Sequence, residues 1–273
     1  MITFPNCKIN LGLRILQKRN DGFHDLETFF YPLALKDALE IITIQDNSQF
    51  SISGSIAIPE DENVCTKAYH LLKKDFPQLG SIKMHLHKII PVGAGLGGGS
   101  ADGAFTLILL NKKFNLELSN DQLINYALQL GSDCPFFIIN KPCFATGRGE
   151  ILEPGKLDLS NYKIVVVNPN IHISTAWAFS RITPSVPKKS IKEIIQQPIE
   201  TWKNELLNDF EGPVFKNHPE IKKIKEQLND AEAVYSAMSG SGSSVYGIFE
   251  KEKQAVFNFP SEYFVKELFC QAK

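Results

Sequence analysis

A run of glycines near the middle of the chain constrains the fold most. Five glycines stand among the eleven residues Pro91–Ala101, PVGAGLGGGSA. A structural turn needs one or two glycines, because each further glycine adds to the conformational entropy that folding must overcome. Such a run instead allows backbone N–H groups to approach an anionic ligand closely. The glycine loop, defined as residues 91–101, is therefore predicted to bind phosphate.

The residues on either side of the glycine loop support this prediction. Ile82–Ile90 alternates between apolar and polar side chains, which is typical of a strand. An apolar helical stripe follows the loop at Ala104, Phe105, Ile108 and Leu109. A helix that begins directly after a loop adds its unpaired N–H groups and its dipole to an anion site. We expect the Ser100 hydroxyl to reach a phosphate oxygen or a bound Mg²⁺.

Two common phosphate-binding motifs fit the glycine loop poorly. Gly93, Gly95 and Gly98 match the dinucleotide pattern G-x-G-x-x-G, and Glu117 stands where a ribose-binding acid is expected. A stretch this rich in glycine matches the pattern by accident, and the surrounding hairpins lack alternating βαβ order. An NAD-dependent oxidoreductase is therefore disfavoured. The P-loop of nucleoside triphosphatases is excluded more firmly, because no lysine follows the glycines.

The remaining patterns predict an α+β protein. Cys7–Leu16 alternates strictly and predicts a strand, and His24–Leu33 predicts its hairpin partner after a turn at Asn20–Gly22. Further strands are predicted at Ile41–Ile44, Phe50–Ile58, Lys163–Asn168, Val234–Met238, Ser244–Phe249 and residues 262–269. Helices are predicted from a start at Asp61, Glu62 and Asn63, at Asp121–Leu130, and near residues 174–182, 189–196, 200–208 and 218–229. Glycine, proline and charge gather at residues 147–160, so we expect two domains, residues 1–155 and 156–273.

Composition excludes several classes of protein. The chain has 29 basic and 30 acidic residues, so no net field attracts it to nucleic acid or to an acidic membrane. It shows neither a signal peptide nor an apolar run long enough to span a bilayer. Its five cysteines include no CxxC pair and are expected to be free thiols in a reducing compartment. We therefore expect a cytoplasmic protein.

Three motifs together resemble those of a known kinase superfamily. Pro91–Ser100 is similar to the ATP-binding motif of the GHMP kinases, which include galactokinase, homoserine kinase, mevalonate kinase and phosphomevalonate kinase. An early strand that contains Lys8 and a second glycine-rich loop at Ser239–Ser243 agree with this resemblance. The resemblance implies a two-domain α+β fold, with an N-terminal domain like domain 2 of ribosomal protein S5 and a ferredoxin-like C-terminal domain. It also implies that ATP and Mg²⁺ are needed.

Further motifs point to one branch of this superfamily. They are Lys8-Ile9-Asn10-Leu11, Asp21-Gly22-Phe23-His24 and GSDCPFF at residues 131–137. The resemblance implies phosphorylation of the 2-hydroxyl of a methylated erythritol that carries a cytidine diphosphate group, in the non-mevalonate pathway of isoprenoid precursor biosynthesis. It implies a small-molecule substrate and a monomer or homodimer. A homoserine-type or mevalonate-type kinase and a nucleotide-binding module without catalysis stay open as alternatives.

The resemblance assigns catalysis to Asp133 and Lys8. Asp133 is the expected base for the hydroxyl proton, although an aspartate just after Gly131 is in itself typical of a turn or a helix cap. Lys8 is expected beside Asp133, where it would keep the carboxylate ionised and offset charge on the transferring phosphoryl group. Without the resemblance, a lysine in a mostly apolar strand is expected to face solvent.

The resemblance also assigns the substrate-binding residues. Asn10 lies on the same strand face as Lys8 and can reach the same pocket. Phe23 and His24 are expected to recognise cytosine by stacking and by hydrogen bonds to its edge. Many members have tyrosine where this chain has Phe23, so a hydroxyl contact is absent here. Phe179 is the expected second stacking residue, with Trp177, or a core role for Phe179, as alternatives.

The expected nucleotide-binding residues come from four segments. Asn63 and Lys88 are expected near adenine, and Ser239, Gly240, Ser241 and Gly242 form the second glycine-rich loop. The glycine loop itself contributes Pro91, Val92, Gly93, Ala94, Gly95, Leu96, Gly97, Gly98, Gly99, Ser100 and Ala101. Gly103 stands where the family more often has alanine, and we expect it to weaken the start of the helix by about 1 kcal/mol.

Overall fold

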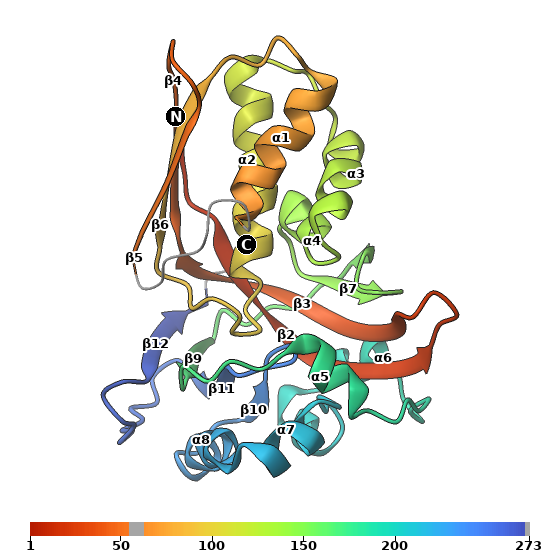
Figure 1. The fold of residues 1–273 in the computed structure, drawn as a ribbon. Coiled ribbons are helices and arrows are strands. Elements are labelled where there is room, and N and C mark those ends of the chain that lie inside the picture. Colours follow the sequence, from red (N-terminus) through yellow and green to blue (C-terminus); the bar gives the residue numbers. More distant parts are fainter. Residues whose placement is uncertain (55–62, 271–273) are drawn as a thin grey trace. The chain divides into compact units, whose positions relative to one another are not determined.

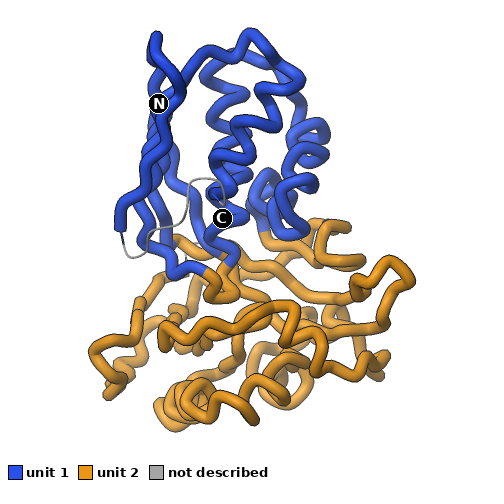
Figure 2. Tube along the Cα trace, in the orientation of Figure 1, with its two compact units in different colours: residues 1–7, 35–92, 97–141 blue, residues 8–34, 93–96, 142–273 orange. Residues whose placement is uncertain are grey.

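The computed structural model describes residues 1–54 and 63–270, and Figure 1 shows the order of their elements. The chain divides into two compact units, which Figure 2 colours separately. Unit 1 consists of residues 1–7, 35–92 and 97–141, and unit 2 of residues 8–34, 93–96 and 142–273. This division is discontinuous along the chain, because the first hairpin and part of the glycine loop group with the C-terminal residues. The predicted boundary between residues 155 and 156 stays a prediction.

Unit 1 contains a four-stranded sheet. Its strands occur in the order β1 (Ile2–Thr3), β4 (Ala38–Thr43), β6 (Ile82–Lys88) and β5 (Gln49–Gly54). β5 pairs with β6 in parallel, and the other two pairs are antiparallel. The alternation predicted for β6 buries Ile82, Met84 and Leu86 on one face of the sheet.

Helices complete unit 1: α1 (Val64–Asp75) and α2 (Gly98–Phe114) lie beside that face of the sheet, and α3 (Asn120–Leu130) and α4 (Cys134–Ile139) pack on these two helices (Figure 1). α1 begins where predicted, because the Asn63 side chain accepts a hydrogen bond from the Cys65 N–H at 2.8 Å and so caps the helix. α2 begins at Gly98, inside the glycine loop and earlier than its apolar stripe predicts.

Two further four-stranded sheets lie wholly or mostly in unit 2. The first has the order β2 (Asn6–Lys18), β3 (His24–Lys36), β7 (Cys143–Thr146) and β8 (Ile151–Pro154). The second has the order β10 (Tyr235–Met238), β11 (Val245–Glu250), β9 (Tyr162–Asn168) and β12 (Phe264–Phe269), all antiparallel. The hairpin predicted from Cys7 to Leu33 is thus present as β2 and β3.

Helices complete unit 2. They are α5 (Thr175–Ser180), α6 (Ile191–Ile195), the 3₁₀ helix η2 (Ile199–Asn204), α7 (Glu211–Asn217) and α8 (Pro219–Asp230). α8 buries Ile221, Ile224 and Leu228 in a core that also contains Val165 and Phe249 of the second sheet. The helix predicted at residues 200–208 is the 3₁₀ helix η2, which ends at Asn204. Helix α7 was not predicted from the sequence.

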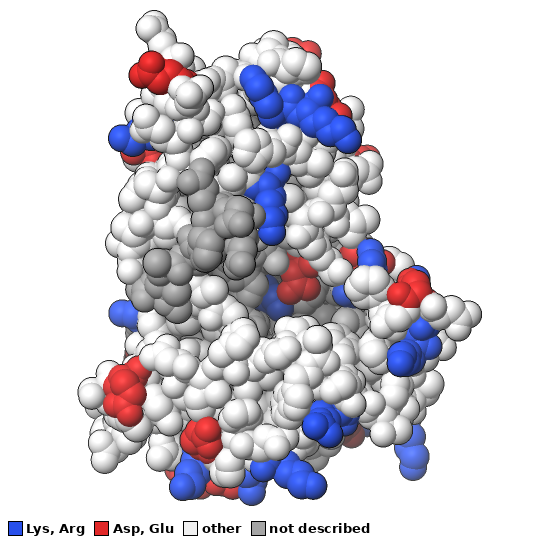
Figure 3. Space-filling view, viewed as in Figure 1, with Lys and Arg blue, Asp and Glu red and all other residues white. Residues whose placement is uncertain are grey.

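Most predicted elements are confirmed, within a few residues at each end. The short elements α4, α7, β7 and β8 were not predicted. Residues 55–58 of the predicted strand Phe50–Ile58, and Asp61 and Glu62 of the predicted helix start, lie outside the described residues. In the part of the chain that the structure describes, no helix is long and apolar enough to cross a membrane. Basic and acidic side chains are interspersed on the face drawn in Figure 3.

Candidate active site

In unit 2, the middle of the glycine loop is bonded to the second glycine-rich loop. The Ala94 carbonyl accepts a hydrogen bond from the Ser244 N–H at 3.1 Å, and the Gly95 carbonyl accepts one from the Ser239 hydroxyl at 2.8 Å. Gly95 has φ +77°, and a Cβ there would lie 2.0 Å from the Ser239 carbonyl oxygen. Only glycine fits this position. The two glycine-rich segments predicted to bind ligand are therefore brought together.

Strand β2 contributes Lys8 and Asn10 to the same cluster. The Lys8 N–H donates to the Leu96 carbonyl at 2.9 Å, and the Asn10 N–H donates to the Ser239 hydroxyl at 3.2 Å. The Lys8 ammonium donates to the Asn10 side-chain oxygen at 2.5 Å and lies 4.8 Å from the Phe30 ring centroid. Lys8 is only 3% exposed, so the solvent-facing alternative is wrong.

Three residues that the sequence did not suggest hold this cluster in place. Asn208 donates to the carbonyls of Met238 and Gly240, at 2.7 and 2.8 Å. The Tyr246 hydroxyl donates to the Asn10 carbonyl at 2.8 Å, and the Asn10 amide donates to the Thr28 hydroxyl at 3.0 Å. Asn208 is a long way from its partners along the chain and belongs to no motif, so no sequence signal identified it.

In unit 1, the rest of the glycine loop forms the first turn of α2. Gly97 is the N-cap residue and has φ +70°, so the helix starts from a left-handed residue without a side chain to cap it. Its first N–H groups are those of Gly98, Gly99 and Ser100, which point out of the helix end. A helix start with this form is a ready site for an anion. This arrangement agrees with the predicted phosphate site.

Asp133 stands at the start of α4, also in unit 1. It lies in a turn and occupies the N-cap position, as the structural alternative predicts, although its side chain makes no capping hydrogen bond. A catalytic role for Asp133 stays a prediction. The next residue, Cys134, is buried, which raises the pKa of its thiol to about 12 despite a hydrogen bond with Ser100. The starts of α2 and α4 are therefore adjacent. Lys8 belongs to unit 2, so its predicted pairing with Asp133 stays a prediction.

Lys88, predicted near adenine, lies in a buried cluster of charges in unit 1. Its ammonium donates to Asp102 at 2.7 Å and to Asp37. Asp37 also accepts hydrogen bonds from the N–H groups of Ile89 and Ile90. Burial raises the pKa of Asp102 to about 7, against the charge of Lys88. A contact of Lys88 or Asn63 with the nucleotide stays a prediction. In the structure Lys88 pairs with Asp37 and Asp102, and Asn63 caps helix α1.

The predicted cytosine-binding residues are in unit 2. The rings of His24 and Phe179 stack with centroids 4.9 Å apart and an angle of 21° between their planes. Trp177 instead has its ring 6.3 Å from that of His218. Burial, and the nearby charge of Lys18, lower the pKa of His24. The structure thus brings Phe179, rather than Trp177, beside the Asp21-Gly22-Phe23-His24 turn.

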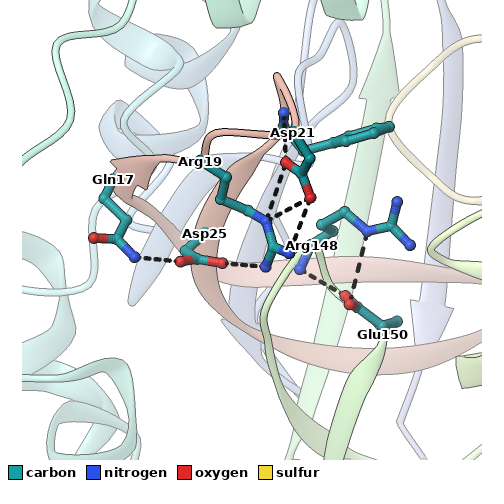
Figure 4. A network of polar contacts seen from close by, with 7 residues as sticks. Gln17, Arg19, Asp21, Asp25, Arg148 and Glu150 are labelled. Atoms are coloured by element: carbon teal, nitrogen blue, oxygen red, sulfur yellow. Dashed lines mark hydrogen bonds and ion pairs between the residues drawn. The ribbon is translucent and has the colours of Figure 1, made fainter.

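A network of charged residues surrounds this turn (Figure 4). Arg19 forms ion pairs with Asp21 at 3.0 Å and Asp25 at 2.9 Å, and Asp25 accepts a hydrogen bond from Gln17. The Asp21 carboxylate also accepts a hydrogen bond from the Phe23 N–H at 3.1 Å. Because these bonds favour the ionised form, the pKa of Asp21 is lowered.

Comparisons with known proteins identify the family of this chain. Residues 63–141 match the family described as GHMP kinases N terminal domain, and residues 190–266 match the family described as GHMP kinases C terminal. A protein of Bacteroides thetaiotaomicron named 4-diphosphocytidyl-2-C-methyl-D-erythritol kinase is 55% identical over 260 residues, which are 92% of this chain and 93% of that protein. A protein of the same name from Bacteroides fragilis is 51% identical over 273 residues, 96% of this chain and 99% of that protein.

Solved structures show the same relationship. A crystal structure of 4-(cytidine 5'-diphospho)-2C-methyl-D-erythritol kinase is 31% identical, covers 90% of this chain and 89% of its own, and has a TM-score of 0.78. The mevalonate kinase of Methanococcus jannaschii has a TM-score of 0.68 at 15% identity over 93% of this chain and 92% of its own, which shows a shared fold only.

The fold and both family matches define a GHMP kinase, so the predicted α+β class and two-domain GHMP fold are confirmed. Within that class, the chain belongs to the 4-diphosphocytidyl-2-C-methyl-D-erythritol kinase family. It is an ATP-dependent kinase, and a catalytically inactive nucleotide-binding module is no longer a useful alternative.

Proposed function

We propose that this chain transfers the γ-phosphoryl group of ATP to the 2-hydroxyl of 4-diphosphocytidyl-2-C-methyl-D-erythritol, in the non-mevalonate pathway of isoprenoid precursor biosynthesis. The observation that carries the proposal is the 51–55% identity to proteins named for this activity, over nearly the whole chain. The stacked pair His24 and Phe179 supports it, because a flat base is recognised by stacking together with hydrogen bonds to its edge.

The nucleotide phosphates bind at the glycine loop. N–H groups at the start of α2 and the helix dipole balance phosphate charge, and the N-cap residue Gly97 has no side chain that would occupy these N–H groups. Phosphoryl transfer needs little more than alignment and neutralisation of charge. The glycine loop supplies both for the donor side of the reaction.

Asp133 and Lys8 act on the acceptor hydroxyl. Asp133 receives or orients the proton of the 2-hydroxyl, and Lys8, held by Asn10, offsets negative charge on the transferring group. Asn10 orients Lys8 and is itself fixed by Thr28 and Tyr246. Phe23, His24 and Phe179 bind the cytosine and so place the hydroxyl.

Mg²⁺ fits this site as a companion of ATP. In the described residues, no group of three or more His, Cys, Asp or Glu side chains could hold a metal ion. The ion would therefore be held by phosphate oxygens and water, with the Ser100 hydroxyl as a protein ligand of suitable chemistry. When bound, Mg²⁺ neutralises charge on the phosphates. We further propose that the protein acts in the cytoplasm, where its five free cysteines stay reduced.

A panel of acceptors tests the proposal. ADP formation is measured with ATP, Mg²⁺ and, in turn, 4-diphosphocytidyl-2-C-methyl-D-erythritol, mevalonate and homoserine. We expect turnover with the first acceptor only, and inhibition by CMP or CDP that competes with the acceptor. Turnover of mevalonate or homoserine without such competition would support the alternative GHMP kinases instead.

A further inference from the structure

Arg148 lies over the ring of Phe23. The carbon at the centre of its guanidinium group is 4.7 Å from the ring centroid. Phe23 is 51% exposed. A phenyl ring has two faces, and here a flat cation covers one of them. The exposed half of Phe23 is the part of the ring on which a second flat partner could stack.

The turn that carries Arg148 is fixed at both ends. Arg148 stands between Gly147 and Gly149 in the turn that joins β7 to β8, and the Gly147 carbonyl accepts a hydrogen bond from the Leu26 N–H of β3 at 2.7 Å. Glu150 accepts a hydrogen bond from the Arg148 backbone N–H at 2.6 Å, and its other oxygen lies 3.7 Å from the guanidinium (Figure 4). The position of the cation therefore follows from the fold of the hairpin.

The turn that carries Phe23 is fixed as well. Asp21 accepts the Phe23 N–H and pairs with Arg19, which also pairs with Asp25. The pKa of Asp21 is lowered by the hydrogen bond from Arg19 above all, and the charge of Arg148 contributes. The negative charge of Asp21 thus attracts the cation that lies over the neighbouring ring.

We propose that Arg148 is a positioning residue for the cytosine of the substrate: it holds one face of Phe23 and so presents the other face to the base. The phenyl ring has no polar group with which to fix its own orientation. A guanidinium group supplies that orientation, because it is planar and attracted to the ring face. This inference rests on the proposed function.

Steady-state kinetics of Arg148→Met tests the inference. We expect the KM for the cytidine-bearing acceptor to rise about 2- to 5-fold, which is the size of an exposed cation–π contact. The kcat and the KM for ATP should stay unchanged. Arg148→Lys should give an intermediate KM, because a lysine keeps the charge but not the flat surface. The matched control is Lys192→Met, which removes a cation 5.6 Å from the Phe144 ring and should change neither KM.

A second substitution shows whether Arg148 acts through Phe23. In a Phe23→Ala background, Arg148→Met should add no further increase in the acceptor KM. A full additional increase would mean that Arg148 acts independently of the ring and would overturn the inference. An unchanged acceptor KM in Arg148→Met, or an equal rise in the KM for ATP, would overturn it too. If the wild-type protein does not phosphorylate the acceptor, the proposed function is wrong, and the inference about Arg148 is then wrong as well.

Discussion

The ammonium of Lys88 lies 2.7 Å from the carboxylate of Asp102, and neither side chain is more than 3% exposed. Lys88 ends strand β6, and Asp102 stands in the first turns of α2, so the pair joins the two segments that enter and leave the glycine loop. Asp37 completes the cluster and holds the N–H groups of Ile89 and Ile90, just before the loop. The position of the glycine loop therefore depends on three buried charges.

Removal of the cation should destabilise the protein strongly. Lys88→Met leaves two buried carboxylates without a cation, and we expect the free energy of unfolding in urea to fall by about 3–5 kcal/mol. Adding Asp102→Asn to Lys88→Met should recover part of that loss, because one uncompensated charge is gone. A decrease in the unfolding free energy of less than about 1 kcal/mol in Lys88→Met would contradict this account. So would a double variant whose decrease equals the sum of the decreases in Lys88→Met and Asp102→Asn.

Gly103 has a role that its helix propensity did not suggest. It is fully buried where α1 and α2 pack together, and a Cβ there would lie 2.5 Å from a methyl carbon of Val64. Gly103→Ala should therefore lower the unfolding free energy by about 1–3 kcal/mol, although alanine favours a helix. Val64→Ala in the same chain should relieve the contact. A Gly103→Ala variant that is more stable than the wild-type protein would contradict this prediction, because it would show that α1 moves away from α2 at little cost.

Local sequence patterns predicted the strands and helices near the site well. They did not predict which polar side chains are buried by residues distant in the sequence. Residues close together in the sequence determine the alternation in β2 and β6 and the start of α1 after Asn63. These features can therefore be predicted from the sequence. The burial of Lys8 depends on residues far along the chain, and an alternating strand with one lysine looks the same when it faces solvent. Asp37, Lys88 and Asp102 are likewise separated by 51 and 14 positions.

The choice among aromatic residues shows the same limit. Phe179 and Trp177 are two residues apart in a short helix, and no period decides which of them meets His24. Arg148 stands between two glycines, and such a residue is typical of a solvated turn. Its contact with Phe23 becomes visible only when β7 is paired with β3.

Protonation of His24 should weaken the fold. Burial, with the charge of Lys18, lowers its pKa below the ordinary value of 6.5, so the unfolded chain binds the proton more readily. The stability that depends on neutral His24 is therefore complete above pH 6.5 and is lost as pH falls through the lowered pKa. An NMR titration should find His24 below 6.5 and shifted upward in Lys18→Met. A His24 that titrates at or above 6.5 would contradict the prediction.

Asp133→Asn should separate binding from catalysis. An amide keeps the shape of the side chain but accepts no proton, so we expect kcat to fall by about 100-fold or more while ATP binding, measured by calorimetry, is retained. The matched control is Asp121→Asn, which changes an acidic residue in the first turn of α3 and should leave kcat unchanged. Unchanged turnover in Asp133→Asn would remove Asp133 from the proton transfer.

The identity of the product tests the central claim most directly. The protein is incubated with ATP, Mg²⁺ and 4-diphosphocytidyl-2-C-methyl-D-erythritol, and the product is analysed by mass spectrometry and by phosphorus NMR. We predict a product that is one phosphoryl group heavier than the acceptor, with the new phosphate on the 2-hydroxyl. A protein that binds ATP but forms no such product, or that phosphorylates a different oxygen, would contradict the proposed function.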